Sequence, residues 1–509
     1  MQTIPVTALI LLVPVILWRL LKKKSLPLPP GPPKRFLTGN LHQLPKTKQW
    51  LTYAEWAKTY GPLMTLQVLS RRSIVLNSAK AAVDLLDGRA GIYSDRPISV
   101  MLDLAGQTSA MFGLRSVDSR FPRYRKMLVA GLNKRSVVHY RGIMESRVRG
   151  LLRGLSENAD DYESLITTYT GGIALKIAYG YDVEEPAEKD YFVQLIDRAE
   201  TAMPTLVQPF YPVEVFPFLK YVPTWFPTAA FHRIALEKKK ILGDMVYVPY
   251  EWAKKKLETS PSEPSFFSQH FLGENDDDEK ARGVLSQEDA DYLTWTAGAI
   301  YSGGAHTTSS GITSFLLLMS MYPEIQKRAQ AEIDAVLGRD RLANMDDRAS
   351  MPYINAMIKE VLRWAPVAPL GLRHRVIQDD IYEGYLIPKG SMIVPNIWAI
   401  THDAEMYPDP FTFDPSRFLG DKEQRDPYDF VFGFGRRVCP GSTLAQETIF
   451  LAITNTLALF DISKALDSAG KEVDPMKDLD WRTGLVTLAL NFKFRLTPRT
   501  ADGLVLLDS

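Results

Sequence analysis

The order of apolar and polar residues along the chain predicts a mainly helical protein with a minor β part. Apolar residues recur at helical spacing in some segments and alternate with polar residues, as in strands, in others. The helical segments are residues 50–60, 79–86, 323–337 and 355–364, and the strand-like segments are residues 63–68, 73–76 and 486–496. We find no internal repeat in this pattern, so we expect one large α-rich domain.

One predicted helix, residues 287–322, is much longer than the others. Ser286 and Asp289 stand at the spacing of a capping box at its start, and Pro323 ends it. At the rise of an α-helix its length is about 50 Å. From position 297 to its end it contains no Asp, Glu, Lys or Arg and one histidine, His306. We therefore expect it to run buried through the middle of the domain.

A cluster of small residues, Ser302-Gly303-Gly304-Ala305, lies inside this helix. Each glycine costs about 1 kcal/mol of helix propensity relative to alanine, so the cluster needs a compensating role. One interpretation is close packing against a neighbouring helix. The other is that the helix backbone must stay clear of a bulky bound group.

The N-terminal segment has the pattern of a membrane anchor. Residues 1–18 carry no charge and, as a helix, would span about 27 Å, close to the thickness of an endoplasmic reticulum bilayer. Arg19 and the lysines at 22–24 follow, which places the rest of the chain in the cytosol by the positive-inside rule. A secretory signal peptide would carry its basic residues before the apolar run, so the reversed order favours a retained anchor. The proline-rich sequence LPLPPGPP then predicts an extended linker. We expect an anchor at 1–24, a linker at 25–34 and a globular catalytic domain at 35–509.

Composition and charge narrow the possible partners. Lys and Arg number 60 against 59 Asp and Glu, so the chain has no strongly basic character and we expect no nucleic acid partner. Hydrophobic residues make up 46% of the chain, which is enough for a large core. The single cysteine, Cys439, excludes a disulfide within the chain and suits a reducing cytosolic environment.

That cysteine lies in a glycine-rich loop that indicates its chemistry. A thiolate that binds iron needs N–H donors around its sulfur, and glycines let the backbone approach closely. A helix predicted at residues 443–457 would also bring its N-terminus near the sulfur and favour the anion. A lone thiol is ordinarily a buried structural cysteine. The residues at fixed offsets in this loop favour an iron ligand instead: Phe432, Gly433, Gly435, Arg437, Cys439 and Gly441.

This pattern, Phe-x-x-Gly-x-Arg-x-Cys-x-Gly, resembles the haem-binding signature of the cytochrome P-450 monooxygenases. Residues 360–363 are similar to the family's Glu-x-x-Arg helix, and residues 413–418 to its later Pro-x-Arg-Phe segment. The resemblance implies the cytochrome P-450 fold and a salt-bridged network of Glu360, Arg363 and Arg417, in which one carboxylate accepts charge-assisted hydrogen bonds from two guanidiniums. An isolated Glu-x-x-Arg pair on a helix surface would contribute only about 0.2–0.5 kcal/mol.

The resemblance also implies haem b as cofactor, with the thiolate of Cys439 as the axial ligand of its iron. The family's donors to the haem propionates match Arg437, His374 with Arg375, and Arg125. A solvated surface charge is the alternative for Arg125, because the family usually has Trp and Arg where Phe121 and Pro122 stand. 

Residues 303–308 of the long helix resemble the family's oxygen-activation motif. The resemblance implies that the glycines leave room for O2 and that Thr307 helps to deliver protons to it. The position of His306 is normally Asp or Glu in the family. A histidine titrates near neutrality and can relay protons; a buried neutral histidine bonded to a backbone carbonyl is the other interpretation.

By this resemblance the protein inserts one atom of O2 into a lipophilic substrate, by hydroxylation or epoxidation. Electrons would come from NADPH through a separate membrane-bound cytochrome P-450 reductase, which basic residues near the cysteine loop, such as Arg436, Lys126 and Arg123, could attract. We expect a single-pass protein of the endoplasmic reticulum membrane with a cytosolic catalytic domain.

Family resemblance places the substrate-contacting segments at residues 98–117, 367–370 and 484–488 and in the middle of the long helix, and these are mostly apolar. The Tyr93-Ser94-Asp95-Arg96-Pro97 run and the Phe-Gly-Phe-Gly form of the haem loop look most like fungal members of secondary metabolism, acting on terpenoids or polyketides. A haem-thiolate isomerase or peroxide-dependent enzyme that does not activate O2 is one alternative, and a non-catalytic membrane haem binder is another. Thr307 argues against both.

Overall fold

The computed structural model describes residues 26–183, 190–207, 211–227, 229–259, 264–272, 285–477, 479–482 and 484–507. The expected membrane anchor lies outside these ranges. Within the described ranges, none of the helices combines the length and the apolar character needed to cross a bilayer.

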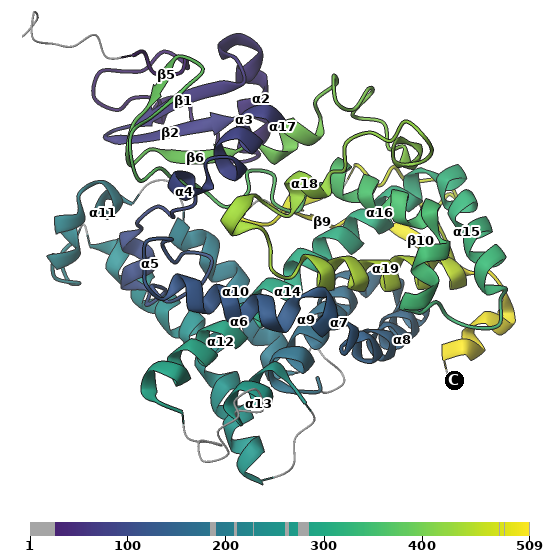
Figure 1. The fold of residues 1–509 in the computed structure, drawn as a ribbon. Helices are drawn as coiled ribbons and strands as arrows, with labels where there is room; N and C mark the ends of the chain where they lie inside the picture. The colour runs from purple at the N-terminus through teal and green to yellow at the C-terminus, as the bar shows by residue number, and fades with distance from the viewer. Residues whose placement is uncertain are drawn as a thin grey trace, which may run out of the picture.

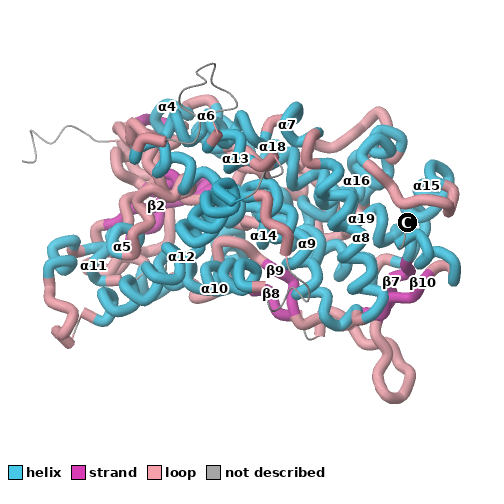
Figure 2. Tube along the Cα trace, turned by 90° about the horizontal axis from the view of Figure 1, so that it is seen from below, coloured by secondary structure: helices cyan, strands magenta, loops and turns pink. Residues whose placement is uncertain are grey.

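The described chain is mainly α-helical, with its strands in small sheets, as the sequence pattern predicts (Figure 2). A helical body surrounds α14, and a smaller β part lies at one side of it (Figure 1). The helices are α2 (Gln49–Tyr60), α3 (Ala79–Ala82), α4 (Ala90–Tyr93), α5 (Val100–Leu104), α6 (Phe121–Leu132), α7 (Lys134–Val138), α8 (Arg141–Glu157), α9 (Tyr162–Tyr179), α10 (Tyr191–Val207), α11 (Pro212–Val215), α12 (Ala230–Thr259), α13 (Phe266–Phe271), α14 (Gln287–Met321), α15 (Pro323–Leu337), α16 (Pro352–Trp364), α17 (Ile397–Thr401), α18 (Tyr428–Val431) and α19 (Ser442–Leu459).

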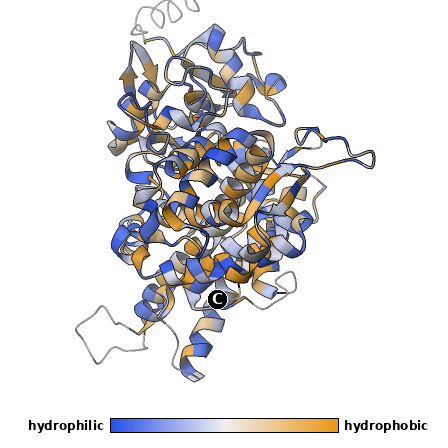
Figure 3. Cartoon of the chain, turned by 90° about the vertical axis from the view of Figure 1, so that its right-hand side faces the viewer, coloured by the Kyte–Doolittle hydropathy of each residue, from blue (hydrophilic) through white to orange (hydrophobic). Residues whose placement is uncertain are grey.

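The central helix α14 begins and ends where its sequence signals lie. The Ser286 side chain accepts a hydrogen bond from the Asp289 backbone N–H at 3.1 Å, and the helix ends at Met321, before Pro323. From Tyr292 onward most residues of α14 are buried. The main exception is the region around Gly303, where Gly303 is exposed and some of its neighbours are half-buried. Helices α9, α12 and α19 pack against it. Hydrophobic residues gather toward the middle of the molecule (Figure 3).

The largest sheet has four strands in the order β1 (Leu63–Val68), β2 (Arg71–Leu76), β6 (Met392–Pro395) and β3 (His374–Arg375). β1 and β2 form an antiparallel hairpin, and β6 joins β2 in parallel. This sheet brings the N-terminal part of the globule beside the segment that follows α16. The remaining strands form pairs: β4 (Asp380–Tyr382) with β5 (Tyr385–Ile387), β7 (Phe460–Lys464) with β10 (Phe494–Pro498), and β8 (Asp480–Arg482) with β9 (Leu488–Leu490).

Two local predictions differ from the structure. The helix expected at residues 79–86 is α-helical only in α3 and continues as a π-helical turn, Val83–Asp87. The strand expected at residues 486–496 is divided into β9 and β10, which belong to different sheets. Asn491 lies between them with a φ of 61°, in the left-handed region, so the chain turns there and cannot continue as one strand.

The proline-rich segment is non-helical, as predicted, but it does not stand away from the globule. The Pro27 carbonyl accepts from the Leu386 N–H at 2.8 Å, and the Pro30 carbonyl accepts from the Thr65 N–H at 2.7 Å. The segment therefore lies along the β part of the fold, beside β1 and β5.

Candidate active site

The cysteine loop connects α18 to α19 through a single 3₁₀ turn, Gly435–Arg437. Its backbone folds back on itself, because the Cys439 N–H donates to the Phe432 carbonyl at 2.8 Å. Burial raises the pKa of the Cys439 thiol, while the Gly441 N–H and the charge of Arg125 oppose that rise by favouring the thiolate.

Gly435 has a conformation and a setting that exclude a side chain. Its φ is +52°, and a Cβ there would lie 2.4 Å from the Leu86 carbonyl oxygen and 3.0 Å from the Ala90 Cβ. Its N–H donates to the Asp87 carboxylate. The loop is thus pressed against the segment between α3 and α4, which fixes the position of Cys439.

Two uncovered surfaces lie deep in the domain. Cys439 is surrounded by protein and yet keeps a largely uncovered side chain. On α14, Gly303 is exposed although the helix is otherwise buried, and no heavy atom lies within 4 Å of the place a Cβ would take. We infer that both surfaces border one internal hollow, with α14 contributing Gly303 and the loop contributing Cys439.

The two glycines of α14 serve different purposes. A Cβ on Gly304 would lie 3.0 Å from the Ala174 Cβ, so Gly304 permits close packing against α9. Gly303 meets no such neighbour and leaves open space beside the helix. Both interpretations of the glycine cluster therefore hold, one for each residue.

Three arginines without a carboxylate partner among the described residues lie near the cysteine loop: Arg96, Arg125 and Arg437. The Arg437 guanidinium donates to the carbonyls of Ser94 (2.9 Å) and Leu114 (2.6 Å), and burial lowers its pKa to about 10. Arg96 is fully buried, and burial lowers its pKa to about 9. Burial also lowers the pKa of Arg125, against the attraction of the Cys439 side chain. Asp95 acts on Arg96 and Arg437 without forming an ion pair with either of them. Buried cations without a directly bound carboxylate are costly, so this arrangement suits a bound anion.

His374 and Arg375, the other expected donors to the haem propionates, contact the end of α4 and the segment that follows it. Burial lowers the pKa of His374 well below its usual value, with the charge of Arg96 acting in the same direction, so the ring is neutral at pH 7. Its Nδ1–H donates to the Tyr93 carbonyl at 2.9 Å. Arg375 lies 3.5 Å from the Asp95 carboxylate, which also binds Arg115. Both residues therefore hold the segment around Asp95 in place.

Thr307 and His306 follow one another on α14 but make contacts in different directions. The Thr307 hydroxyl donates to the Gly303 carbonyl at 2.6 Å, on the open stretch of the helix. The His306 ring is buried, and its Nε2 lies 3.1 Å from Oδ1 of Asp197 on α10. The partner of His306 is thus a carboxylate and not the backbone carbonyl of the second interpretation.

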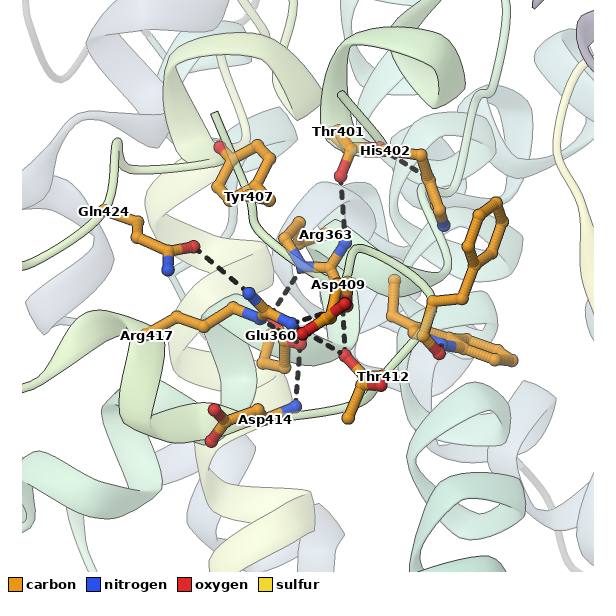
Figure 4. Close-up of polar contacts among 12 residues, drawn as sticks. Glu360, Arg363, Thr401, His402, Tyr407, Asp409, Thr412, Asp414, Arg417 and Gln424 are labelled. Carbon is orange, nitrogen blue, oxygen red and sulfur yellow. Dashed lines mark hydrogen bonds and ion pairs between the residues drawn. The ribbon is translucent and has the colours of Figure 1, made fainter. Parts of the chain in front are cut away.

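The structure brings Glu360, Arg363 and Arg417 together in a fully buried network (Figure 4). Arg363 binds the Glu360 carboxylate through Nε (2.6 Å) and Nη2 (2.8 Å), and Arg417 approaches it through Nε (3.3 Å). Arg363 also donates to the carbonyl of Thr401 at the end of α17, and Arg417 donates to the carbonyl of Thr412 in the loop that follows α17. The network ties α16 to the chain that leads to the cysteine loop.

Three of the segments expected to contact substrate meet at one place. The Thr487 N–H donates to the Val367 carbonyl at 2.9 Å, and the Ser310 hydroxyl of α14 donates to the Thr487 carbonyl at 2.5 Å. Pro204 of α10 lies within 3.5 Å of the place a Cβ on Gly484 would take. These contacts put residues 367 and 484–487 beside α14 and α10.

Sequence reasoning missed Arg96 and Asp197 as members of this site. A signal existed for Arg96, because it stands in the Asp95-Arg96-Pro97 run that connects α4 to α5. No local signal marks Asp197, which is a charged residue in an amphipathic helix.

Comparison with known proteins finds a matching family and similar proteins. Residues 29–494 match the family described as Cytochrome P450. "Cytochrome P450 monooxygenase claR" of Ampulloclitocybe clavipes is 37% identical over 485 residues, which cover 93% of this chain and 87% of that protein. "Cytochrome P450 monooxygenase 176" of Postia placenta is 38% identical over 479 residues, 93% of this chain and 90% of that protein. "Cytochrome P450 monooxygenase ple1" of Rhodocybe pseudopiperita is 36% identical over 498 residues, 94% and 91% of the two chains.

Proposed function

This chain belongs to the cytochrome P450 family, and from that premise we propose that it inserts one oxygen atom of O2 into a lipophilic substrate, with its haem bound through Cys439. Members of the family are oxygen-incorporating oxidoreductases that use haem b and receive electrons from NADPH through a reductase. When bound, the haem supplies the activation of O2.

One observation carries the proposal: Cys439 keeps an uncovered side chain in a glycine-rich loop, beside buried arginines that form no ion pair with any described residue. Cys439 would hold the haem iron through its thiolate, supported by the Gly441 N–H. Arg96, Arg125 and Arg437 would bind the two haem carboxylates, whose charge offsets the cost of burying these guanidiniums. The residues present therefore fit the cofactor.

Gly303 would keep the backbone of α14 clear of the space that O2 and substrate need, because no heavy atom lies within 4 Å of the place a Cβ would take. The Thr307 hydroxyl lies on the same stretch of α14 and can pass a proton from its Oγ1 toward the hollow while it accepts another. We assign proton delivery during oxygen activation to this hydroxyl.

The substrate we propose is a lipophile. The segments beside α14 and α10 offer Val367 and the Leu485–Val486 pair, and α14 itself carries no Asp, Glu, Lys or Arg in this region. An apolar lining favours hydrocarbon-rich molecules through the hydrophobic effect. Because the similar proteins named above come from fungi, terpenoids and polyketides of fungal secondary metabolism are the classes we propose.

An exposed aromatic surface supports a location at a membrane. In residues 216–226, five large aromatic side chains are exposed: Phe216, Phe218, Tyr221, Trp225 and Phe226. Arg71 of β2 binds Glu214 of α11 at 2.7 Å, so this surface lies on the same side as the β part where the described chain begins (Figures 1 and 2). Exposed Trp and Tyr favour the membrane interface. We propose the endoplasmic reticulum membrane, with the apolar residues 1–18 as anchor and the catalytic domain on the cytosolic face.

The reductase would approach the surface outside the cysteine loop. Arg436 and Lys126 are exposed there and make no ion pair with any described residue, so they can attract an acidic partner. Arg123, in contrast, binds Asp289 at the start of α14 and covers the Tyr292 ring at 4.2 Å. We therefore propose Arg436 and Lys126, and exclude Arg123, as contacts of the reductase.

Oxygen labelling tests the proposed function. Membranes containing this protein and an NADPH-dependent reductase are first titrated with terpenoids and polyketides, and a lipophile that shifts the Soret band is chosen. Turnover under ¹⁸O₂ should then place one ¹⁸O atom in the product and require NADPH. Product that takes its oxygen from water, or that forms with peroxide but not with NADPH and O2, would refute the proposal.

A further inference from the structure

A carboxylate from a distant segment of the chain binds the backbone of the cysteine loop. Asp87 ends the π-helical turn Val83–Asp87, and its carboxylate accepts a hydrogen bond from the Gly435 N–H. Gly435 opens the 3₁₀ turn that leads to Cys439, and the residue before that turn provides no side-chain cap. The first N–H of a helical turn has no partner within the turn, so Asp87 satisfies it from outside.

The π-helical turn that carries Asp87 departs from ordinary helix geometry. The Gly88 N–H donates to the Val83 carbonyl, five residues earlier, at 2.9 Å. A Cβ on Gly88 would lie 2.8 Å from the Asp84 carbonyl oxygen, so the turn requires a glycine directly after Asp87. The π-helix is rare and occurs mostly as single turns, frequently at functional sites. The functional element that this turn contacts is the cysteine loop.

Two adjacent residues of the turn hold the loop in different ways. Leu86 is buried in the same apolar cluster as Phe434, the residue before Gly435. Asp87 is exposed, and its side chain forms no ion pair and no second hydrogen bond within the described ranges of the chain. Arg425 and Asp429 act on its charge in opposite directions without binding it. The one direct polar contact of this carboxylate is therefore with the loop backbone.

Backbone hydrogen bonds connect this contact to the proposed ligand of the haem iron. The Gly435 carbonyl accepts from the Val438 N–H at 3.3 Å, and the next residue, Cys439, donates its N–H to the Phe432 carbonyl at 2.8 Å. The same turn carries Arg437, one of the arginines proposed to bind the haem carboxylates. The position of Gly435 therefore affects both the thiol and the guanidinium.

We propose that Asp87 is a positioning residue, whose hydrogen bond to the Gly435 N–H keeps Cys439 and Arg437 in the arrangement that binds haem. The proposal rests on the proposed function, because it concerns the same cysteine. Asp87 acts through the loop backbone and is not itself a ligand of the cofactor. A carboxylate suits this role, since a hydrogen bond to a charged acceptor is shorter and stronger than one to a neutral acceptor.

Two substitutions in the full-length holoenzyme test the hydrogen bond. Asp87→Ala removes the acceptor, whereas Asp87→Asn keeps an oxygen that can accept the Gly435 N–H. In Asp87→Ala, the loss of haem to an excess of apomyoglobin should be about tenfold faster, as expected when a charge-assisted hydrogen bond is lost. Part of its reduced carbon monoxide complex should also lack the red-shifted Soret band of a thiolate ligand. Asp87→Asn should stay close to the wild type in both measurements.

Amide hydrogen exchange gives a readout that depends neither on turnover nor on the spectrum. In Asp87→Ala, exchange should be faster in the peptide that contains residues 432–441, because the loop opens locally more often. In Asp87→Asn, exchange in that peptide should match the wild type.

Asp84→Ala is the matched control. Asp84 lies on the same π-helical turn, but its carboxylate binds Lys80 (2.7 Å) and Tyr382 (2.8 Å) and not the loop. Its removal should leave haem loss, spectrum and loop exchange unchanged, although it breaks more contacts than Asp87→Ala.

Three results would overturn the positioning role of Asp87. They are wild-type haem loss and spectrum in Asp87→Ala, equal changes in Asp84→Ala, and an Asp87→Asn variant that behaves like Asp87→Ala. A wild-type protein without the red-shifted band would instead overturn the proposed function, on which the role of Asp87 depends.

Discussion

The Arg437 guanidinium lies over the face of the Phe121 ring, 4.0 Å from the ring centre. Phe121 stands at the start of α6, four residues before Arg125, and its side chain is buried. The ring therefore holds in place one of the arginines proposed to bind the haem carboxylates. A cation over an aromatic face gains about 0.5–2 kcal/mol, more when it is desolvated.

Phe121→Ala should therefore weaken haem retention, whereas Phe121→Trp should preserve it. The loss of haem to an excess of apomyoglobin would be several-fold faster in the alanine variant, because Arg437 loses its support. Phe36→Ala is the control, since Phe36 is fully exposed and its removal should leave the rate unchanged. Equal rates for Phe121→Ala and the wild type would contradict the supporting role of the ring.

Glu360→Gln should strongly destabilise the folded protein. It leaves two buried guanidiniums without their carboxylate, and breaking a buried ion pair in this way costs about 3–5 kcal/mol. Urea unfolding followed by tryptophan fluorescence measures the change. Glu324→Gln breaks the exposed pair with Lys327 and should change stability by less than about 1 kcal/mol. Similar effects of the two substitutions would show that the network in Figure 4 contributes little.

The adjacent glycines of α14 should respond to alanine in opposite ways. Gly304→Ala places a methyl group 3.0 Å from the Ala174 Cβ and should lower the free energy of unfolding by about 1–3 kcal/mol. Gly303→Ala meets open space and should raise it by up to about 1 kcal/mol through helix propensity.

The Gly303→Ala variant also tests whether the hollow borders α14 at this position. The Gly303→Ala methyl group would occupy the space beside the haem, so the affinity for a bulky azole that binds at the iron should fall. Thermal unfolding and an azole titration measure the two effects. If Gly303→Ala destabilises the protein and leaves the azole affinity unchanged, the hollow does not border Gly303.

Thr307→Ala should preserve substrate binding but divert reducing equivalents to hydrogen peroxide, because the proton donor beside the hollow is lost. Product, peroxide and NADPH are measured together. Thr296→Ala provides a matched control on the same helix. The Thr296 hydroxyl makes the same kind of bond to the carbonyl four residues earlier, at 2.6 Å, but it is fully buried. Fully coupled turnover in Thr307→Ala would refute the role of its hydroxyl.

The sequence predicted best those features that local residues determine. The bounds of α15 and β1 agree with their predicted ranges, because Pro323 begins the first and alternating side chains mark the second. Gly303 and Gly304 were both recognised as costly, but their separate purposes depend on Ala174 of α9 and on a hollow, neither of which is local. The division of the last predicted strand depends on the single backbone conformation of Asn491.

The candidate site shows the same limit. The motifs predicted that Glu360, Arg363 and Arg417 form one network, and the structure places them in contact. The spacing of the motifs could not predict that the His374 ring is neutral, because its lowered pKa results from burial and from the charge of Arg96. The contact of His306 with Asp197 could not be predicted either, because it forms only when α10 and α14, which are distant in sequence, come together in the fold.

The spectrum of the reduced protein with carbon monoxide tests the central claim, that the thiolate of Cys439 binds the haem iron. Carbon monoxide bound opposite a thiolate shifts the Soret band strongly to the red, and the wild type should show this band. Cys439→Ser should lose it, while thermal unfolding of the two haem-free proteins remains similar, because the substitution is small and the side chain faces the hollow. An unchanged band in Cys439→Ser would contradict the account.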